Sequence, residues 1–251
     1  MTSHKNRRLS DVPQSRPPKP TGISDRRIIF RRHPLFTHLP DADVDQLLRY
    51  ARIERHKAGH TIFLKGSPGH GMMAVLSGQV RISAPSPEGK EIVLNLVGPG
   101  EVFGEIALLD GHERTADAVA MNDCELLVLE RRDFIPFLER HPEVCIRLME
   151  VLCARLRRTS EQVEDVLFLE LPARLAKMLL RLAKEHGHTT AAGQVIDLKL
   201  SQRELGNLTG ATRESVNKQL REWQAIGIVE TSANRLIIRA PESLRRLAGS
   251  Q

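Results

Sequence analysis

Residues 201–223 read SQRELGNLTGATRESVNKQLREW, and this stretch decides how the C-terminal part of the chain folds. Its apolar residues recur at the spacing of amphipathic helices, at Leu205, Leu208, Val216 and Leu220. Gly210 is suited to end a first helix, and Thr212 is suited to cap the N-terminus of a second. The stretch therefore predicts two short helices joined by a tight turn.

The second of these helices would carry charged side chains on its exposed face. Arg213 and Glu214 open that helix, and Lys218 follows one turn later. This layout is typical of a helix-turn-helix whose second helix enters the DNA major groove, although a helical hairpin with a charged solvent face shows the same pattern. Residues 227–239 then predict a β-hairpin, which would complete a winged helix-turn-helix. The strands of that hairpin would be 228–229 and 236–238, and its turn 232–234.

Charge is distributed unevenly along the 251 residues. Residues 1–32 carry nine Lys or Arg and two Asp, residues 33–170 carry 15 basic and 22 acidic side chains, and residues 171–251 carry 13 and seven. The chain is thus a basic tail, an acidic body and a basic C-terminal module. A basic module of about 80 residues that contains a helix-turn-helix indicates nucleic-acid binding more strongly than the overall net charge of +6 does.

Composition bounds the class of protein. Hydrophobic residues make up 41% of the chain and charged residues 27%, as in a globular protein with one large or two modest domains. No apolar run approaches the roughly 20 residues that span a bilayer, and the basic N-terminus lacks the apolar segment of a secretory signal. Cys124, Cys145 and Cys153 lack metal-ligand spacing, and His186 and His188 have no further ligand cluster nearby. We therefore expect a cytoplasmic protein without membrane contact or a metal site, with its cysteines buried and reduced.

The part of the chain before residue 130 changes character twice. Residues 1–30, rich in Arg, Ser and Pro, predict a disordered basic tail that either attracts DNA weakly or serves as a solubilising linker. Residues 31–55 predict short helices, one of which starts at Pro40 and Asp41. Over 58–129, short apolar runs alternate with glycine turns about every ten residues, which predicts a β-sandwich or jelly roll. The predicted strands are 61–64, 72–76, 79–82, 91–97, 116–119 and 125–129.

Residues 132–168 predict helix, with a long segment after Pro142. Its stripe is spaced close to the 3.5-residue period of a coiled coil, at Leu148, Leu152, Leu156, Thr159, Val163 and Val166. A helix of about 26 residues extends about 39 Å, which is more than one small sandwich covers. We therefore expect the stripe to pack against the same helix of a second chain in a homodimer. Pro172 would end this helix, and another would follow over 173–184.

A second informative segment reads FGEIALLDGHERTA at residues 103–116. Gly104 follows a predicted strand and precedes a helical turn, so its backbone can approach an anion. Arg114 offers a rigid fork for a phosphate, and Thr115 adds a hydroxyl beside it. Glu105 would be repelled by a phosphate and suits a sugar hydroxyl or the arginine itself. The segment predicts a nucleotide pocket, and the alternative is a Glu–Arg ion pair that braces a loop.

This segment closely resembles the phosphate-binding cassette of cyclic-nucleotide-binding domains, with Gly-Glu at its start and Arg-Thr-Ala at its end. Residues 31–240 resemble the CRP/FNR family of bacterial regulators, in particular its cAMP receptor protein (catabolite activator) branch. Besides the cassette, residues 154–182 are similar to that family's dimer helix and hinge, and the helix-turn-helix is similar to its DNA-reading unit. The resemblance implies an α+β fold. Its parts would be a disordered basic tail at 1–30, a cyclic-nucleotide-binding β jelly roll at 31–140, a dimerisation helix at 141–170 and a winged helix-turn-helix DNA-binding domain at 171–251.

The resemblance also implies how a cyclic nucleotide would be held. The residues that it assigns to the ligand are Gly104, Glu105, Arg114, Thr115, Arg155, Thr159 and Ser160. Glu105 would accept a hydrogen bond from the ribose 2′-hydroxyl, and Arg114 with Thr115 would hold the cyclic phosphate. Thr159 and the partner subunit's Ser160 would meet the adenine. Together these residues favour cAMP, but a threonine hydroxyl can donate or accept, so cGMP stays open as the ligand.

On the DNA side, the residues that the resemblance assigns are Ser201, Gln202, Arg203, Thr212, Arg213, Glu214, Ser215 and Lys218. Arg213 would donate to guanine, and Glu214 would accept from a cytosine amine. Lys218 stands where the family commonly has arginine, so it lacks the planar fork. We expect double-stranded DNA with two-fold-symmetric half-sites similar to TGTGA, about 34 Å apart. The exposed loop at 186–193 corresponds in position to a loop of the family that contacts RNA polymerase, which makes the polymerase an expected partner.

Other functions remain open at this point. The same fold could respond to cGMP, to cyclic di-GMP or to no ligand. A nucleotide-sensing subunit that regulates a partner protein would share the sandwich but would not need the Arg213–Glu214 pair or the hairpin. An enzyme is disfavoured, because the sequence shows no nucleophile–base pair, metal cluster or phosphate-transfer loop.

Overall fold

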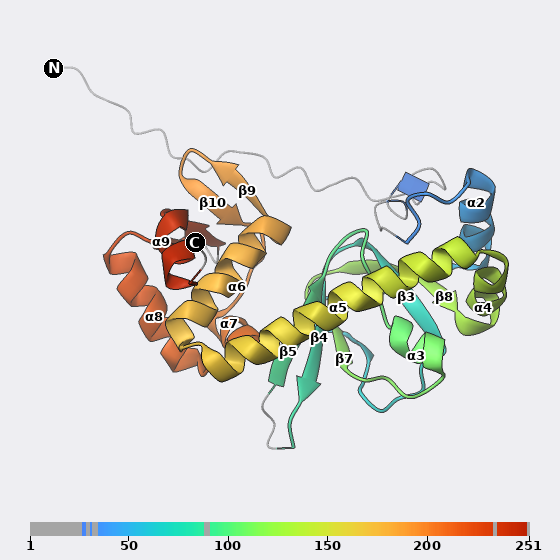
Figure 1. The fold of residues 1–251 in the computed structure, drawn as a ribbon, viewed down its shortest axis with the longest axis horizontal. Coiled ribbons are helices and arrows are strands. Elements are labelled where there is room, and N and C mark those ends of the chain that lie inside the picture. The colour runs from blue at the N-terminus through green and yellow to red at the C-terminus, as the bar shows by residue number, and fades with distance from the viewer. Residues whose placement is uncertain (1–26, 29–30, 32–34, 88–90, 233–234, 250–251) are drawn as a thin grey trace.

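The computed structural model describes residues 27–28, 31, 35–87, 91–232 and 235–249. Most of the tail predicted at 1–30 therefore lies outside the described residues, as do Ala233 and Asn234 of the predicted hairpin turn. A β-sandwich, a long helix and a smaller unit of helices and sheet follow one another along the chain (Figure 1). The predicted α+β class, with a β domain, a long helix and a C-terminal helix-turn-helix, is confirmed.

The helices and strands can be followed in Figure 1. The helices are α2 (Asp41–Tyr50), α3 (Glu105–Asp110), α4 (Arg131–Arg140), α5 (Pro142–Phe168), α6 (Leu171–His186), α7 (Gln202–Thr209), α8 (Arg213–Ala225) and α9 (Pro241–Leu247). The strands are β1 (Arg52–His56), β2 (Thr61–Phe63), β3 (Gly71–Ser77), β4 (Val80–Pro85), β5 (Glu91–Val97), β6 (Val102–Phe103), β7 (Asp117–Ala120), β8 (Cys124–Glu130), β9 (Gly187–Thr190), β10 (Gly193–Ile196), β11 (Val229–Ser232) and β12 (Arg235–Ile238). Within the described residues they form three antiparallel sheets, ordered β1-β8-β3-β6, β2-β7-β4-β5 and β11-β12-β10-β9.

Strands β3 and β8 lie in the middle of the first sheet and are buried on both faces. Met73 pairs with Val128 across these strands, and both belong to the core between the two sheets. Met72 and Leu127 belong instead to the core that the same sheet shares with α2, α4 and α5. Successive strand residues face opposite sides, so a strand covered on both sides needs a continuous apolar run. This is why the runs at 72–76 and 125–129 predicted strands correctly.

Two local predictions are wrong. Residues 52–55, within the range expected to be helical, belong to the edge strand β1, which pairs with β8 from Arg52 opposite Val128 to His56 opposite Cys124. The loop expected at 186–193 is largely a hairpin, because β9 pairs with β10 and β10 pairs in turn with β12 of the wing. Strand β1 owes its conformation to β8 and strand β10 pairs with β12, and both partners are distant in the sequence and override weak local preference. Strand β9 pairs only with its neighbour β10.

Helix α5 has the length that the sequence predicted, and it ends at Phe168 before α6 begins at Leu171. The predicted helix break near Pro172 is therefore confirmed. Among the helices of the described residues, none is both long and apolar enough to cross a membrane. The expectation that all three cysteines are buried is wrong: Cys124 is buried, but Cys145 is half-buried and Cys153 is exposed on α5. Helical periodicity places a cysteine on a face and does not say what covers that face.

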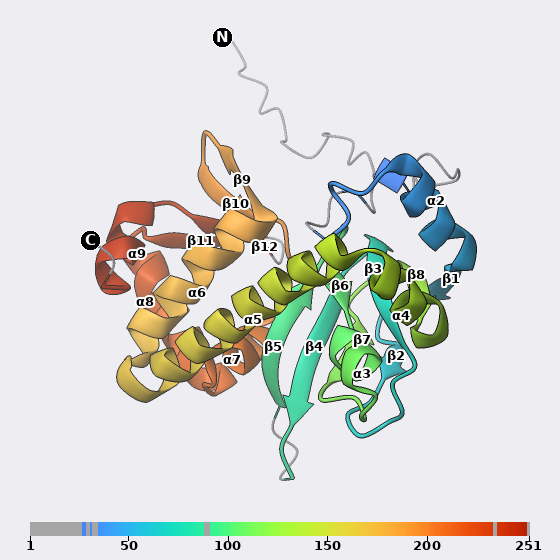
Figure 2. The same cartoon turned by 45° about the vertical axis from the view of Figure 1, so that its right-hand side comes forward.

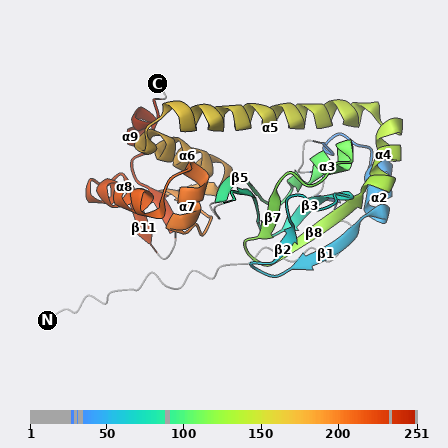
Figure 3. The same cartoon turned by 90° about the horizontal axis from the view of Figure 1, so that it is seen from below.

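The C-terminal unit, which follows the β-sandwich in the sequence, also packs against it. Val93 and Leu96 of β5 join the hydrophobic core that α6, α7, α8 and the third sheet build. At the edge of this contact the Asn207 amide donates to Glu91 over 3.0 Å, and Glu91 also pairs with Arg81. Figure 2 shows β5 beside α7, and Figure 3 shows α5 running along one side of both units. A change at the sandwich can therefore reach the C-terminal unit through β5 and through α5.

Candidate functional site

A cavity of about 160 Å³ opens between strands of the sandwich, helix α3 and helix α5. Its apolar walls include Phe63, Ile82 and Phe103. Its polar lining consists of Asn95, Gly104, Glu105, Arg114, Thr115, Arg155, Arg158 and Thr159. Six of the seven residues that the sequence assigned to a ligand therefore meet at one cavity, although they come from segments about fifty residues apart. Only Ser160 lies outside this lining.

Arg114 is the buried cation of the cavity, with 6% of its surface exposed. Its two terminal nitrogens donate to the backbone oxygens of Gly104 and Gly71, each over 2.7 Å. The guanidinium lies over the Phe63 ring, 4.3 Å from its centre, and burial lowers the pKa of Arg114. Its Nε atom is buried without a hydrogen-bond partner in the protein. The side chain is thus held in one orientation while part of its donor capacity is left over.

Gly104 is required by the shape of this site. Its φ of +78° lies in the left-handed region, which side chains other than glycine rarely adopt. A Cβ atom there would also lie 2.7 Å from the Arg114 Nη1. Glycine at this position therefore lets the backbone turn into α3 and lets the arginine approach it.

Glu105, the first residue of α3, is 1% exposed. One of its carboxylate oxygens accepts a hydrogen bond from Arg155 of α5, and Arg155 also donates to the backbone oxygen of Val102. The other carboxylate oxygen is buried without a partner. The sequence left open an ion pair between Glu105 and Arg114. Glu105 pairs instead with Arg155, and this ion pair joins α5 to the cassette.

The hydroxyl residues of the site differ in position. Thr115 and Thr159 are exposed residues that line the cavity, one from the cassette and one from α5. Ser160, one residue further along α5, is exposed and donates to the backbone oxygen of Leu156 over 3.1 Å. Adjacent helix positions point about 100° apart, so Thr159 faces its own cavity while Ser160 faces outward.

Unsatisfied polar atoms gather at this cavity. Among the described residues, eight buried side-chain nitrogen or oxygen atoms have no hydrogen-bond partner in the protein, and four of them belong to residues of the cavity lining. These four are Asn95 Oδ1, Glu105 Oε2, Arg114 Nε and Arg158 Nε. Burying such atoms unpaired costs about 1–3 kcal/mol each, so their concentration indicates a binding site for a polar ligand.

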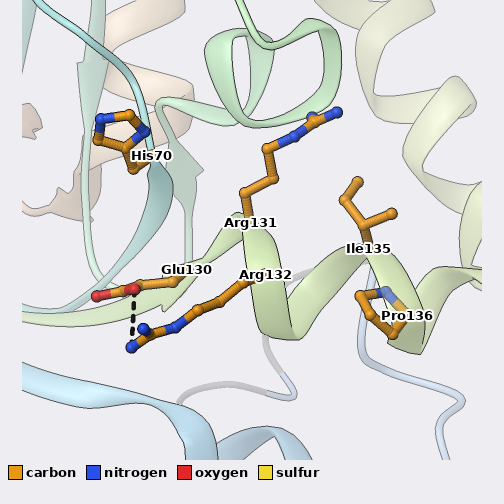
Figure 4. Close-up of a pocket in the computed structure, with 6 residues that line it drawn as sticks. All are labelled: His70, Glu130, Arg131, Arg132, Ile135 and Pro136. Carbon is orange, nitrogen blue, oxygen red and sulfur yellow. Dashed lines mark ion pairs between the residues drawn. The ribbon is translucent and has the colours of Figure 1, made fainter.

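A larger, more open hollow of about 550 Å³ lies beside α4 (Figure 4). Its charged lining already has partners: Glu130 pairs with Arg132 over 3.1 Å and also with Arg52. Arg131 donates to the backbone oxygens of Leu108 and Leu109 at the end of α3. This hollow therefore offers a ligand far less unpaired polar chemistry than the cavity beside α5.

The helix-turn-helix has the caps that the sequence predicts at Gly210 and Thr212, and it has a further cap at Ser201. Ser201 and Glu204 form a reciprocal capping box at the start of α7, and Gly210 ends that helix with φ of +65°. Thr212 caps α8, because its hydroxyl accepts from the Ser215 backbone nitrogen over 3.2 Å. Gly206 lets the turn approach α7, since a Cβ there would lie 2.7 Å from the backbone oxygen of Ala211. These local contacts fix the start of α8.

Most of the predicted DNA-contacting residues lie on the surface of this unit. The exposed ones are Ser201, Arg203, Thr212, Arg213, Glu214, Ser215 and Lys218, whereas Gln202 is half-buried. The Gln202 amide donates to Asn217 over 3.0 Å, which joins α7 to α8. Val216, Leu220 and Trp223 on the other face of α8 are buried. Helix α8 therefore presents a polar face at its N-terminal end.

Two cavity residues, Asn95 and Arg158, were not assigned from the sequence. Asn95 is the one polar residue in the apolar run IVLNLV, and this interruption was the available signal. Arg158 precedes Thr159 in a run of basic residues, where a solvent-exposed position is the ordinary expectation. Only the packing of α5 against β5 brings both residues to one cavity.

Comparisons with known proteins agree with both halves of the structure. Residues 53–141 match the cyclic nucleotide-binding domain, and residues 173–247 match the Crp-like helix-turn-helix domain. The CRP-like cAMP-activated global transcriptional regulator of Mycobacterium tuberculosis is 31% identical over 88% of this chain and 98% of that protein. The cyclic AMP receptor protein of Thermus thermophilus is 34% identical over 86% of this chain and 96% of its own length. A crystal structure of a CRP/FNR-family transcriptional regulator from Thermus thermophilus covers 79% of this chain and 99% of that one, with a TM-score of 0.66 and 31% identity.

Proposed function

Because the chain belongs to the CRP/FNR family of DNA-binding transcription regulators, we propose that it is a cytoplasmic homodimer that binds palindromic DNA when it holds cAMP. The observation that carries the ligand proposal is one cavity with a buried arginine fork and a buried, unpaired carboxylate oxygen. RNA polymerase is the proposed protein partner. The family consists of regulators and not enzymes, so the pocket serves to sense its ligand.

The buried groups complement a cyclic nucleotide from one end to the other. Arg114, with Thr115 and the backbone at Gly104, supplies donors for the cyclic phosphate. The free oxygen of Glu105 supplies an acceptor for the ribose 2′-hydroxyl. Thr159 lies on α5 at the same cavity, where its hydroxyl can meet the base. A phosphate donor set beside a lone hydroxyl acceptor distinguishes a ribonucleotide from a simple anion.

The outward face of α5 supports the proposal of a dimer. Of the predicted stripe, Leu156 is 68% exposed, Val163 52% and Val166 46%. Leu148, at the start of that stripe, is instead buried in the core that α5 shares with the sandwich. An exposed apolar stripe with coiled-coil spacing is stabilised when it packs against an identical stripe. In such a dimer, Ser160 of one subunit would approach the ligand of the other.

This arrangement suggests how the ligand acts. The proposed ligand would contact the cassette and α5 together, and α5 leads directly to α6 and the DNA-binding unit. A ligand shifts a conformational equilibrium only by binding one arrangement more tightly than another. A ligand that contacts both elements meets that requirement, because its contacts depend on where α5 lies relative to the cassette.

Binding of cAMP is tested by titrating cAMP, cGMP and cyclic di-GMP separately while measuring the gel shift of a palindromic duplex with TGTGA half-sites. We expect cAMP to increase DNA affinity at the lowest concentration. A response to cGMP or cyclic di-GMP alone would assign the ligand to that nucleotide. Full DNA binding without any of the three, together with no heat of nucleotide binding in calorimetry, would reject a ligand-switched regulator.

Replacing Glu214 by alanine is expected to relax base choice more than it lowers total DNA affinity. The carboxylate is exposed at the start of α8 and can accept from a cytosine amine, whereas phosphate contacts supply much of the affinity. Discrimination at one base pair of each half-site should fall about tenfold, measured by competition with singly substituted duplexes. The exposed Arg203→Ala is the control, and should weaken all duplexes alike. Unchanged base preference in Glu214→Ala would contradict the role of α8 in reading DNA.

A further inference from the structure

The cavity contains two polar residues that neither the phosphate nor the ribose requires. Asn95 lies on β5 and Arg158 on α5, so two different elements bring these side chains to the cavity. Asn95 Oδ1 and Arg158 Nε are both buried without a partner. One is a hydrogen-bond acceptor and the other a donor. The cavity residues therefore offer a ligand one acceptor and one donor that have no hydrogen-bond partner in the protein.

The local structure explains why Asn95 reaches the cavity. The register of β4 against β5 shifts between Ile82, which faces Asn95, and Ser83, which faces Val93. Leu94 is therefore an extra residue in β5, and both Leu94 and Asn95 line the cavity. Such a bulge redirects side chains that a regular strand would place on opposite faces. The backbone oxygen of Leu94 also accepts from Gln162 of α5 over 3.5 Å.

Arg158 also contacts the C-terminal unit, through α6. Its Nη2 atom pairs with Glu185 of α6 over 3.4 Å, and its Nε atom is buried without a partner in the protein. Thr159 follows Arg158 on the same helix and lines the same cavity. Because Glu185 already pairs with the Arg158 guanidinium, Arg158 offers a phosphate less unpaired positive charge than Arg114 does. We therefore assign Asn95, Arg158 and Thr159 to the base and not to the phosphate.

We propose that Asn95 and Arg158 read the purine, with Asn95 Oδ1 accepting from the exocyclic amine of adenine and Arg158 donating to a ring nitrogen next to that amine. This assignment rests on the proposed function as a cyclic-nucleotide receptor. Adenine presents its 6-amino donor between two acceptor nitrogens, N1 and N7. A 6-oxo purine presents an acceptor in place of that donor, with the N7 acceptor on one side and an N1–H donor on the other. The amine has two hydrogens, so Asn95 and Thr159 can each accept one. The pair therefore selects a 6-amino purine over a 6-oxo purine.

The test of Asn95 is calorimetric binding of cAMP and inosine 3′,5′-cyclic monophosphate, which differ at the 6-amino group. The full-length protein should bind cAMP about tenfold more tightly. Asn95→Leu removes the acceptor at similar volume and should bring the two affinities to within about twofold. Asn95→Asp keeps an acceptor and should retain the preference for cAMP. Equal selectivity in the protein and in Asn95→Leu would overturn the assignment of Asn95.

The test of Arg158 uses 7-deaza-cAMP and 1-deaza-cAMP, in each of which one ring nitrogen beside the amine is replaced by carbon. One analogue should bind about tenfold more weakly than cAMP, and Arg158→Gln should abolish that difference. Glu185→Gln is the matched control, because it breaks the contact of Arg158 with α6 and leaves the guanidinium at the cavity. If Glu185→Gln abolishes the difference too, or if neither analogue binds more weakly, the direct contact is refuted. If the unaltered protein binds no cyclic nucleotide, the proposed function itself fails.

Discussion

Replacing Arg114 by leucine is expected to weaken cyclic-nucleotide binding at least 100-fold, and with it the cAMP-dependent binding of DNA. The guanidinium is the only buried cation that lines the cavity within the described residues. A hydrogen bond to a charged group contributes about 1.5–3 kcal/mol, so the loss of two such bonds to a phosphate costs about 3–6 kcal/mol. Leucine cannot replace either bond. Isothermal titration calorimetry with cAMP measures the loss directly.

The same substitution removes the hydrogen bonds to Gly104 and Gly71, so the folded state needs a separate check. Circular dichroism and the melting temperature in the absence of ligand report whether Arg114→Leu still folds. Arg114→Lys keeps a charge without the fork and should bind nucleotide weakly but measurably. Arg132→Leu, at an exposed position of α4 that does not line the cavity, is the matched control and should bind normally. A folded Arg114→Leu protein with unchanged affinity would remove the cavity from consideration as the nucleotide site.

Glutamate at both Leu156 and Val163 is expected to divide the proposed dimer into monomers. These two side chains lie seven residues apart and are 68% and 52% exposed on the single chain. Burying a leucine or valine contributes about 1.5–3 kcal/mol, and each substitution occurs twice in a symmetric dimer. The dimer dissociation constant should therefore rise about 1000-fold or more, and cooperative binding to a two-half-site duplex should be lost with it. Analytical ultracentrifugation should find 28.2 kDa in place of twice that mass.

The control for this pair is Ala154→Glu, which adds one negative charge at an exposed position of α5. Residue 154 precedes Leu156 by two positions, about 160° away around the helix, so it lies off the stripe. This variant should stay dimeric. A dimeric Leu156→Glu/Val163→Glu protein would place the subunit contact somewhere other than α5.

Local signals in the sequence were sufficient for much of the site. The turn at Gly104 and the cap at Thr212 depend on backbone conformations and hydrogen bonds within a few residues, and both are present as expected. The length of α5 follows from periodicity along one helix. The assignment of Gly104, Glu105, Arg114 and Thr115 to one cavity follows from their proximity in a single short segment.

Other features depended on contacts that no short window contains. Arg52–His56 is a strand because β8, some seventy residues later, supplies its hydrogen bonds. The partner of Glu105 is Arg155 and not Arg114, because α5 crosses over the cassette. The exposure of Cys153 depends on which face of α5 the sandwich covers, and a helical wheel does not contain that information.

Periodicity, caps and glycine positions are properties of neighbouring residues, so the order of the chain alone was enough to place the β domain, the long helix and the helix-turn-helix. Burial, ion pairs and unpaired hydrogen-bonding groups depend on which distant segments pack together and keep water from the space between them. Asn95 and Arg158 therefore come to one cavity only where β5 meets α5, and no short stretch of the sequence contains that contact.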